Sequence, residues 1–473
     1  MPHEVELKFD LDADGPALVG AAGALATTPT DVREHETVYF DTPDRRLHKA
    51  GYSLRVRRSG ERCIQTIKRR NGGSVGLFVR DEWESEVSGF DIARADLAAG
   101  ALKDVLSRAE TASLVPLVTT RFRRTRWLIE RGSGRIEVAL DEGEVGCAAD
   151  RAPIRELELE LLEGKPGTLF RLAEEIGTAV PLRLGVLSKG ERGYALADGR
   201  LGIAAKSEPV RLADGMELGE AFRLVASSCL RHFRLNEIAL MGGGDGEAVH
   251  QARVAMRRLR TALSLFRPML VGNDFQHLRR ELRWATRQLG EARDLDVLVG
   301  RQGASTAQEL LDARDEAHDQ LRAVLRGARA RALMLRLALW IEGGAWRYRK
   351  RSGGALAPFA TAQLDRLWNK VQRRGARLAE IGDEARHRLR IDVKKLRYSA
   401  EFLSGLHGSK PAGRRRDSFL AALRDLQESL GDLNDLRVFG AVETEAEATA
   451  AALTDSAKAF DRAARSAGYW HGA

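Results

Sequence analysis

Residues 249–266 read VHQARVAMRRLRTALSLF, and residues 386–403 read RHRLRIDVKKLRYSAEFL. A constant offset in residue number aligns the two segments and pairs His250 with His387, Arg253 with Arg390, Arg257 with Lys394, Arg258 with Lys395, and Arg260 with Arg397. Two further segments, which begin at Leu282 and Leu423, match at an offset that is larger by four. A duplication of this kind predicts two homologous helical units, each a bundle of about four helices.

Within each repeat the cations form a narrow column beside the apolar face. On a helix with about 100° per residue, Arg253, Arg257 and Arg260 lie within about 80° of His250. A surface helix usually offsets such cations with glutamates four residues earlier, and this column has none. Because stacked like charges repel, the column fits a bound polyanion, and arginine and lysine both bind phosphate oxygens. An ordinary solvated basic face is the alternative interpretation.

The composition of the 473 residues, 44% hydrophobic and 30% charged, is typical of a globular protein. The net charge of +9 is uneven, since residues 1–200 carry −3 and residues 201–473 carry +12, which favours a polyanionic partner for the second half. No apolar run reaches the roughly 18 residues of a membrane span, and the sequence begins without a secretory pattern. The three cysteines are too far apart for a disulfide framework or a zinc site. We therefore expect a cytoplasmic protein without membrane contacts.

Residues 1–200 alternate polar and apolar positions, as in EVELKFD (4–10) and RELELELLE (155–163). This period predicts about eight antiparallel strands in a barrel or sandwich, with helical stretches near 91–110 and 167–177. From about residue 215 the spacing is helical throughout. We predict a multidomain α+β protein with a strand domain (1–203), a linker (204–214) and an all-α domain (215–473) whose repeat units span about 215–350 and 356–473.

Many of the expected strands carry charges of both signs on one face. The positions with shared parity are Glu4, Glu6 and Lys8; Arg55 and Arg57; Lys68; Glu82, Glu84 and Glu86; Arg124 and Arg126; Glu137 and Asp141; and Glu156, Glu158 and Glu160. A single such strand is ordinarily half exposed. If the strands close into a barrel, however, the shared face lines a lumen, which is costly unless it is wet and holds charged ligands. Cations there suit a phosphate chain, and carboxylates suit Mg²⁺ or Mn²⁺.

The duplicated helical motif resembles the CHAD family, the conserved-histidine α-helical domain, over about residues 215–470. The resemblance implies two four-helix units related by pseudo-twofold symmetry around a basic pore, and binding of inorganic polyphosphate. The positions that it assigns to polyphosphate are His250, Arg253, Arg257, Arg258, Arg260, His387, Arg390, Lys394, Lys395 and Arg397.

The opening ExExK motif, followed by YFDTPDRRLHKAGYSLRVRR (39–58), resembles the CYTH family of triphosphate tunnel metalloenzymes over about residues 1–200. The resemblance implies an eight-stranded tunnel that binds a triphosphate and hydrolyses it with a divalent cation, Mg²⁺ or Mn²⁺. It assigns phosphate binding to Lys8, Arg55, Arg57, Lys68, Arg124 and Arg126, with Lys189 of LSKGERGY (187–194) as a weaker candidate.

The same resemblance assigns the metal to carboxylates on the first and last strands. Its metal ligands are Glu4, Glu6, Glu156 and Glu158, and its catalytic set adds Lys8, Glu82, Glu84 and Glu137, whose carboxylates support the metal or orient water. Many members carry a second carboxylate two residues after the position of Glu137, where this chain has Ala139. Asp141 has the same strand parity, so we include it among the metal ligands.

Fusion of the two regions resembles the inorganic triphosphatases. We therefore predict hydrolysis of tripolyphosphate to diphosphate and phosphate in the tunnel, with polyphosphate binding by the helices and association with polyphosphate granules. The main alternative is a non-catalytic protein that binds polyphosphate and targets granules; an adenylate cyclase or another organic triphosphatase is less favoured. Nucleic-acid binding is disfavoured because the basic helices lack a helix-turn-helix signature and an interleaved aromatic platform. The sequence leaves the oligomeric state open.

Overall fold

The computed structural model describes residues 3–25, 27, 29–70, 75–97, 100–132, 134–244, 246–302, 307–378, 380–406, 410–439 and 445–471. The side chains at 3, 4, 70, 79, 80, 95, 96, 410, 411, 434–439 and 445–447 lie outside this description. The chain forms two compact units. The first unit contains Met1–Ser207, Ser227–Met256 and His277–Gly344, and the second contains Glu208–Ala226, Arg257–Gln276 and Ala345–Ala473.

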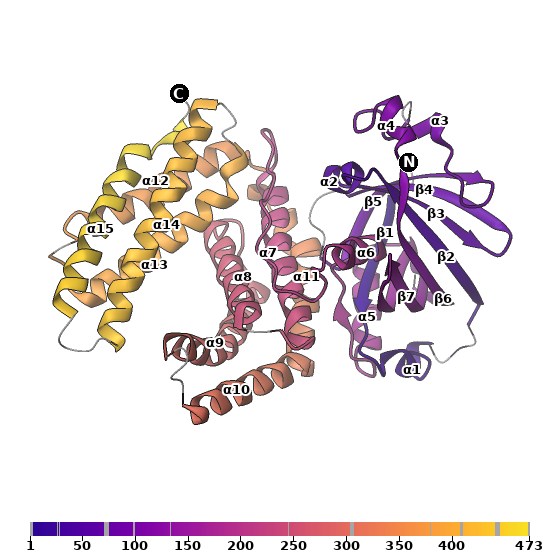
Figure 1. The fold of residues 1–473 in the computed structure, drawn as a ribbon, viewed down its shortest axis with the longest axis horizontal. Coiled ribbons are helices and arrows are strands. Elements are labelled where there is room, and N and C mark those ends of the chain that lie inside the picture. The colour runs from indigo at the N-terminus through magenta and orange to yellow at the C-terminus, as the bar shows by residue number, and fades with distance from the viewer. Residues whose placement is uncertain are drawn as a thin grey trace. The chain divides into compact units, whose positions relative to one another are not determined.

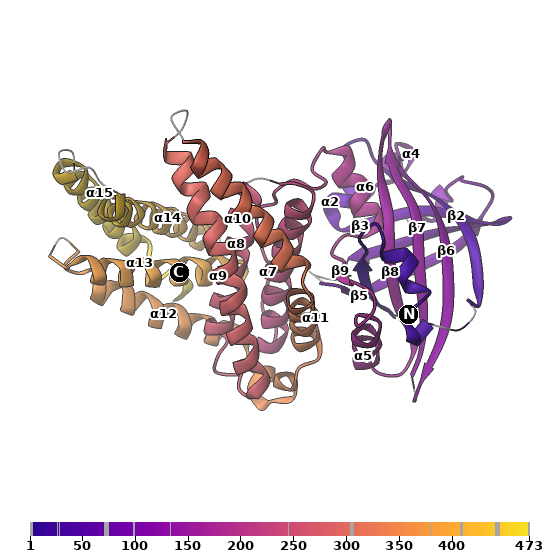
Figure 2. The same ribbon diagram turned by 90° about the horizontal axis from the view of Figure 1, so that it is seen from below.

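A ring of antiparallel strands forms the N-terminal part of the first unit. The strands are β1 (His3–Asp10), β2 (Asp31–Asp41), β3 (Tyr52–Ser59), β4 (Arg62–Arg70), β5 (Leu77–Val87), β6 (Val115–Arg131), β7 (Gly134–Cys147), β8 (Asp150–Glu163) and β9 (Arg183–Leu184). They pair in the order β5-β4-β3-β2-β6-β7-β8-β1-β9, and Figure 2 shows β6, β7 and β8 side by side. Because β1 also pairs with β5, the first eight strands close on themselves, which confirms the predicted eight-stranded antiparallel barrel.

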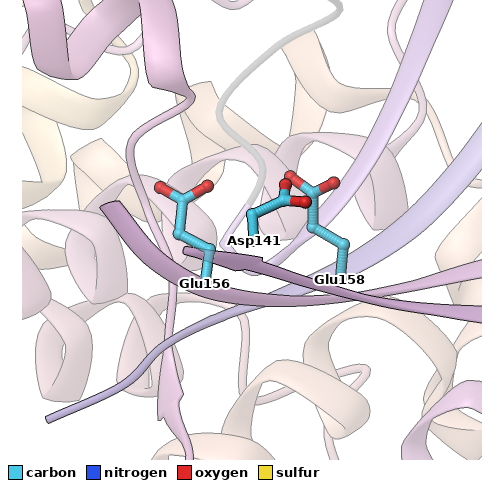
Figure 3. Close-up of side chains that lie close together, drawn as sticks. All are labelled: Asp141, Glu156 and Glu158. Carbon is cyan, nitrogen blue, oxygen red and sulfur yellow. The ribbon is translucent and has the colours of Figure 1, made fainter. Parts of the chain in front are cut away.

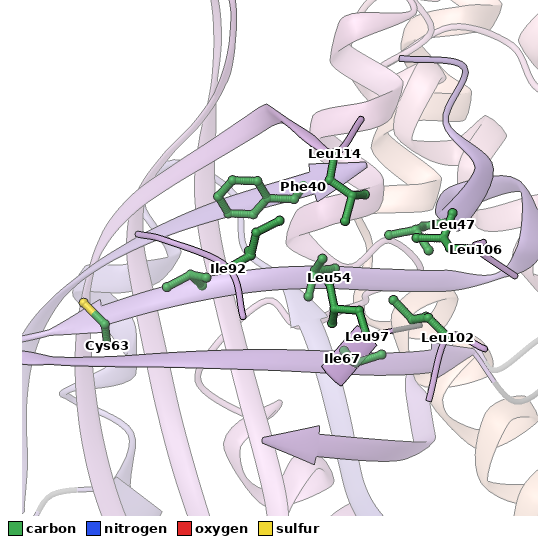
Figure 4. Packing of buried hydrophobic residues seen from close by; sticks show 11 residues of the cluster. Phe40, Leu47, Leu54, Cys63, Ile67, Ile92, Leu97, Leu102, Leu106 and Leu114 are labelled. Carbon is green, nitrogen blue, oxygen red and sulfur yellow. The ribbon is translucent and has the colours of Figure 1, made fainter. Parts of the chain in front are cut away.

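Apolar side chains on the outer face of the ring are covered by short helices and loops. Leu54 and Val56 on β3 have no exposed surface, whereas the alternating Arg55 and Arg57 face the inside. Figure 4 shows Leu54 packed with Leu97, Leu102 and other apolar residues of the covering segments. Burial of each such side chain contributes about 1.5–3 kcal/mol, so this cluster fixes which face of β3 points inward.

The helices that cover the strand ring are short. They are α1 (Gly15–Val19), η1 (Gly23–Leu25), α2 (Arg46–Ala50), α3 (Arg94–Leu97), α4 (Arg108–Ala112), α5 (Gly167–Ile176) and α6 (Lys189–Ala197). The stretch predicted near 91–110 is thus two short helices, while that near 167–177 is α5. Helix α6 begins at the N-cap Ser188, whose hydroxyl accepts a hydrogen bond from the Glu191 N–H, a capping box that places Lys189 in the first turn.

The second half is helical, as predicted (Figure 1). Its long helices are α7 (Leu218–Met241), α8 (Gly246–Leu265), α9 (Asn273–Gln302), α10 (Gln308–Arg326), α11 (Ala328–Gly343), α12 (Leu356–Gly375), α13 (Asp383–Phe402), α14 (Lys410–Phe439) and α15 (Glu445–Ser466), with short turns η3 (Ala345–Tyr348), η4 (Lys350–Gly353), η5 (Ser404–Leu406) and η6 (Tyr469–His471). Within the described residues, no helix is both long and apolar enough to cross a membrane.

The sequence duplication is also a duplication of helix boundaries. The offset that pairs His250 with His387 also relates both ends of α8 to those of α13, both ends of α9 to those of α14, and the start of α10 to the start of α15. The sequence match between α9 and α14, whose offset is larger by four, is therefore shifted by about one turn, which keeps the motif on nearly the same face. Helices α8, α9 and α10 thus correspond to α13, α14 and α15, and α11 follows α10 in the chain.

Candidate functional site

A cavity with a volume of about 110 Å³ for the centres of water-sized molecules, partly open to solvent, lies inside the strand ring. Its wall contains nine of the residues singled out from the sequence: Glu6, Lys8, Arg55, Arg57, Lys68, Arg124, Glu137, Glu158 and Lys189. Other wall residues are Tyr39, His48, Tyr52, Glu160, Glu191 and Tyr194. The expectation of a lumen lined by cations and carboxylates thus describes this cavity, and the strand register determines which charges meet.

Three carboxylates form a row across β1, β8 and β7. Glu6 is the register partner of Glu160, and Glu160 is the register partner of Glu137. All three line the cavity. Directly opposite side chains in a sheet have Cβ atoms about 5 Å apart, and like charges there repel each other. The row therefore favours a bound cation. Glu160 was not among the predicted ligands: its parity with Glu158 was visible, but its register with Glu6 was not.

A second cluster of carboxylates lies next to this row, and only part of the cluster belongs to the cavity wall. Carboxylate oxygens of Asp141, Glu156 and Glu158 lie within 4.8 Å of one another, and Figure 3 shows all three on the same side of adjacent strands. Asp141 and Glu156 have no exposed surface. Lys189 Nζ lies 2.7 Å from Asp141, 2.7 Å from Glu156 and 2.8 Å from Glu158. A lysine ammonium therefore occupies the position between the three carboxylates.

Further cations offset the negative charges of these three carboxylates. Lys8 Nζ lies 2.5 Å from Glu156, and the Nε and Nη2 groups of Arg124 each donate a hydrogen bond of 2.7 Å to Asp141. Ion pairs join four of these cations to four carboxylates: Lys8, Arg124, Lys189 and Arg192 with Asp10, Asp141, Glu156 and Glu158. We refer to these eight residues as the floor network.

The floor network controls the protonation of its members. Burial alone lowers the pKa of Lys189, but Asp141, Glu156 and Glu158 outweigh burial and raise that pKa above its usual range. Burial likewise raises the pKa of Glu158, but Lys189, Arg124 and Lys8 outweigh it and hold the pKa well below its usual range. Both groups are therefore ionised at neutral pH, and the three N–H groups of the Lys189 ammonium are directed at the three carboxylates.

The cations on β3 and β4 are less well compensated. Lys68 Nζ lies 3.2 Å from a Glu82 oxygen, and the Arg55 guanidinium lies 3.8 Å from the same carboxylate. Among the described residues, no carboxylate forms an ion pair with Arg57. Burial, Arg55 and Arg124 lower the pKa of Arg57 to about 10. Arg57 thus stays charged at neutral pH although its surroundings disfavour the charge. A bound anion would stabilise this charge.

Several predicted residues lie outside the cavity wall. Glu84 is exposed and accepts a hydrogen bond of 3.1 Å from the Thr66 hydroxyl. Arg126 forms ion pairs with Asp31 and, at 3.2 Å, with Glu137. Glu82, Asp141 and Glu156 contact wall cations without forming part of the wall themselves, and the Glu4 side chain lies outside the described residues.

Aromatic residues, which the sequence analysis did not single out, line another part of the cavity. The His48 and Tyr194 rings stack with centroids 4.3 Å apart, and the Tyr194 hydroxyl donates a 3.1 Å hydrogen bond to Asp41. Asp41 also accepts backbone N–H bonds from Leu47 and His48 of α2. The buried Asp41 thus connects α2 to α6 and holds both rings at the cavity.

The predicted polyphosphate residues on α8 and α13 differ in exposure. Arg258 is buried, forms an ion pair with Glu401, and lies over the Phe402 ring at 4.8 Å. Arg260 and His387 are exposed. The half-buried members are His250, Arg253, Arg257, Arg390, Lys394, Lys395 and Arg397; of these, Arg253 pairs with Asp294 at 3.0 Å, and Arg397 pairs with Glu401.

A cation cluster in the second unit extends beyond the predicted positions to α12. The buried Asp392 carboxylate lies 2.8 Å from Lys370 Nζ and also pairs with Arg374. Burial lowers the pKa of Lys395; Asp392 opposes this effect, whereas Lys370, Arg260 and Arg374 add to it. Two cations therefore pair with Asp392, and Lys395 interacts electrostatically with this group and with Arg260. Lys370 and Arg374 were missed because they lie outside the duplicated motif.

Models of two known domain families match the strand-rich and the helical regions of the chain. The CYTH domain model matches residues 2–194, and the CHAD domain model matches residues 224–442. The chain is a fusion of a CYTH domain and a CHAD domain. The predicted boundaries at 203 and 215 stay predictions.

Proteins from other organisms are similar to parts of this chain. An inorganic triphosphatase of Haemophilus influenzae is 28% identical over 203 residues, which is 41% of this chain and 55%, about half, of that protein. An uncharacterized protein of Mycobacterium tuberculosis is 25% identical over 441 residues, which is 84% of this chain and 82% of that protein. The crystal structure of the CHAD domain from the plant Ricinus communis is 29% identical, with a TM-score of 0.44, over 57% of this chain and 96% of that structure.

Proposed function

We propose that the CYTH domain hydrolyses inorganic triphosphate to diphosphate and phosphate inside the strand ring. The observation that carries the proposal is that cations and carboxylates line the same cavity. Its wall combines cations from β3 and β4 with a row of carboxylates from β1, β7 and β8. Phosphoryl transfer requires mainly positioning and electrostatic stabilisation, which such a wall supplies. The inorganic triphosphatase from Haemophilus influenzae supports the assignment through its similarity to this part of the chain.

The phosphate chain would bind to Arg55, Arg57, Lys68 and Arg124. Arg57 has the strongest reason to bind an anion, because no described carboxylate forms an ion pair with it and the positive charges of Arg55 and Arg124 act on it more strongly than the charge of Asp141. Arginine can bind two phosphate oxygens at once, whereas lysine acts as a point charge. Lys8 and Lys189 line the same cavity and would add the positive charge of their ammonium groups beside the phosphate chain.

The residues present also fit a divalent cation. Glu6, Glu137, Glu158 and Glu160 offer carboxylate oxygens to the cavity, and such oxygens are the ligands that Mg²⁺ and Mn²⁺ prefer. When bound there, the cation would neutralise charge on the phosphoryl oxygens. We assign Asp141 and Glu156 a different role, because Lys8, Arg124 and Lys189 already neutralise them. They hold these cations in place for the substrate.

The test is phosphate release from tripolyphosphate by the full chain with Mg²⁺ or Mn²⁺. Glu6→Gln should lower kcat/KM by at least about 100-fold, the usual effect of losing one electrostatic group in such a site. Glu142→Gln is the matched control, because Glu142 lies on β7 but pairs with Arg123 on the exposed side of the sheet. Equal activity of Glu6→Gln and the unmodified chain would contradict the proposal, and no release from any triphosphate would favour the non-catalytic alternative.

We also propose that the CHAD domain binds inorganic polyphosphate. The pairing of Lys370 and Arg374 with the buried Asp392, together with the electrostatic interaction of Lys395 with this group and with Arg260, supports this second function. Lys395→Ala should weaken binding of long-chain polyphosphate at low salt, because it removes a phosphate contact. Arg329→Ala is the control, since Arg329 is exposed and pairs with Glu281. If duplex DNA displaces polyphosphate equally well, the surface is a general polyanion site instead.

A further inference from the structure

Helix α7 holds the short segment that delivers Lys189 to the floor network. The Arg234 guanidinium donates a 2.9 Å hydrogen bond to the Leu184 carbonyl. Three residues earlier on the same helix, Arg231 donates to the Val186 carbonyl and forms an ion pair of 3.2 Å with Glu191. These contacts all lie within the first compact unit. Two arginines of one helix therefore hold both sides of the segment 184–191.

Glu191 transmits this restraint to Lys189. One Glu191 oxygen accepts the Ser188 backbone N–H at 2.9 Å, while the other lies against Arg231. The capping box that starts α6 therefore depends on a carboxylate that α7 also contacts. Lys189 is the residue directly between Ser188 and Gly190, so its backbone position follows the orientation of this first turn.

The backbone before α6 leaves little freedom to compensate. The Gly185 N–H donates a 2.8 Å hydrogen bond to the Lys8 carbonyl. A Cβ atom added at Gly185 would lie 2.9 Å from Lys8 Cγ. The segment thus passes directly against the strand that carries Lys8, and a small displacement of residues 185–189 changes the spacing between the two floor lysines.

A chain of charges also connects α7 with the floor network. The Arg234 guanidinium, almost fully buried, lies 3.9 Å from Asp10. Asp10 pairs with Arg192 at 2.8 Å, and Arg192 lies 3.5 Å from Glu156. Because buried charges are weakly screened, the Arg234 charge contributes to the balance of the network that holds Lys189.

We propose that Arg231 and Arg234 are positioning residues of the tunnel, and that α7 completes its floor. Both residues lie inside the CHAD match, outside the residues that the CYTH match covers. Turnover in the CYTH domain then depends on the helical half, whose role is not limited to polyphosphate binding. This inference rests on the proposed hydrolysis of triphosphate, because it assigns the two arginines to the same site.

A double-mutant cycle on the full chain tests the inference. Arg231→Ala should lower kcat for tripolyphosphate about tenfold, or about 1.4 kcal/mol. In a Lys189→Ala background it should have no further effect, because Arg231 acts through Lys189. Arg231→Lys, which keeps a donor for Val186, should recover part of kcat. Arg223→Ala is the control, since Arg223 lies on α7 and pairs with Glu220 at 2.6 Å.

Hydrogen exchange gives a readout that does not require activity. In Arg231→Ala the backbone amides of residues 185–192 should exchange about tenfold faster, whereas Arg223→Ala should leave them unchanged. If the unmodified chain releases no phosphate, the proposed function fails, and hydrogen exchange decides the inference alone. Unchanged exchange in Arg231→Ala, or effects of Arg231→Ala and Lys189→Ala on kcat that multiply, would overturn it.

Discussion

Replacing Lys189 with methionine removes one cation from the floor network, in which four cations meet four carboxylates. Methionine has a similar length and leaves Asp141, Glu156 and Glu158 around an apolar group. The net charge of this buried network thus becomes one unit more negative, while the strand pairing around it stays the same.

The expected cost at pH 8 is about 3–5 kcal/mol of unfolding free energy, the usual range when one partner of a buried ion pair is removed. Acidification should reduce this cost. In the unmodified chain, Lys189 helps to hold the pKa values of Asp141 and Glu156 below their usual range against the effect of burial. Without Lys189, burial should raise the pKa of one carboxylate, so the folded variant takes up a proton.

The sign of the pH effect follows from this uptake. A carboxyl group whose folded pKa is raised stabilises the folded state at low pH, and this contribution disappears as pH rises through that pKa. In the unmodified chain the lowered pKa values have the opposite effect, since stability is lost as pH falls through them. The deficit of Lys189→Met relative to the unmodified chain should therefore be largest near pH 8 and smaller near pH 5.

Thermal unfolding at pH 5, 6, 7 and 8 measures this deficit directly. Lys103→Met is the control, because Lys103 is an exposed lysine of the same domain. Mn²⁺ should raise the unfolding temperature of Lys189→Met more than that of the unmodified chain, since three carboxylates within 4.8 Å are left without their central ammonium. A deficit that is the same at every pH, or a variant as stable as the unmodified chain at pH 8, would refute the reasoning.

Three further substitutions separate stability from binding. Arg57→Met should raise the unfolding temperature without ligand, because it removes a charge that burial disfavours, and should weaken tripolyphosphate binding at least tenfold by calorimetry; a less stable variant would contradict this. Gly193→Ala should cost about 1–3 kcal/mol in urea unfolding, because the added Cβ would lie 2.1 Å from Val118 Cγ1, and an unchanged midpoint would show that α6 moves freely. Arg258→Ala should destabilise the chain by about 3 kcal/mol, since it breaks the buried pair with Glu401. Folded molecules of this variant should keep their affinity for polyphosphate, which a filter-binding assay measures. A specific loss of affinity would instead make Arg258 a polyphosphate ligand.

The alternation of polar and apolar residues was enough to predict the strands and which side chains share a face, whereas the closed tunnel was implied by the family resemblance. Parity depends only on the local two-residue repeat, so Glu156, Glu158 and Glu160 could be placed on one face from the sequence. Register depends on the pairing of β1 with β8, which joins opposite ends of the domain. For that reason the sequence did not show that Glu160 lies opposite Glu6, while Glu156 lies opposite Asp10.

Lys189 shows a second limit of sequence reasoning. It lies in the first turn of a short helix after a coil, without the strand pattern that marked the other lumen residues. Only the packing of α6 against the ring brings its ammonium between the three carboxylates. The capping box of Ser188 and Glu191 defines the start of this helix, but it contains no information on where the helix lies.

The helical repeat of the sequence is also a repeat of the helices, because the offset that relates His250 to His387 also relates their boundaries. It did not predict which cations are exposed. On one helix, Arg258 lies about 80° from His250 on the side away from Arg257 and Arg260. Whether that side faces solvent depends on another helix, and here Tyr398 and Phe402 of α13 cover Arg258. The angle separated Arg258 from the column, but the neighbouring helix decides its burial.

The charge count of the cavity wall bears on how substrate and metal bind. Among the described wall residues there are six cations, Lys8, Arg55, Arg57, Lys68, Arg124 and Lys189, and five carboxylates, Glu6, Glu137, Glu158, Glu160 and Glu191. The wall is therefore nearly neutral by itself. A triphosphate carries several negative charges, so its entry alone would repel the carboxylate row while it attracts the cations. A divalent cation alone would meet the converse problem. Each ligand thus supplies the charge that the other leaves uncompensated, and we expect triphosphate and metal to bind cooperatively, as one complex.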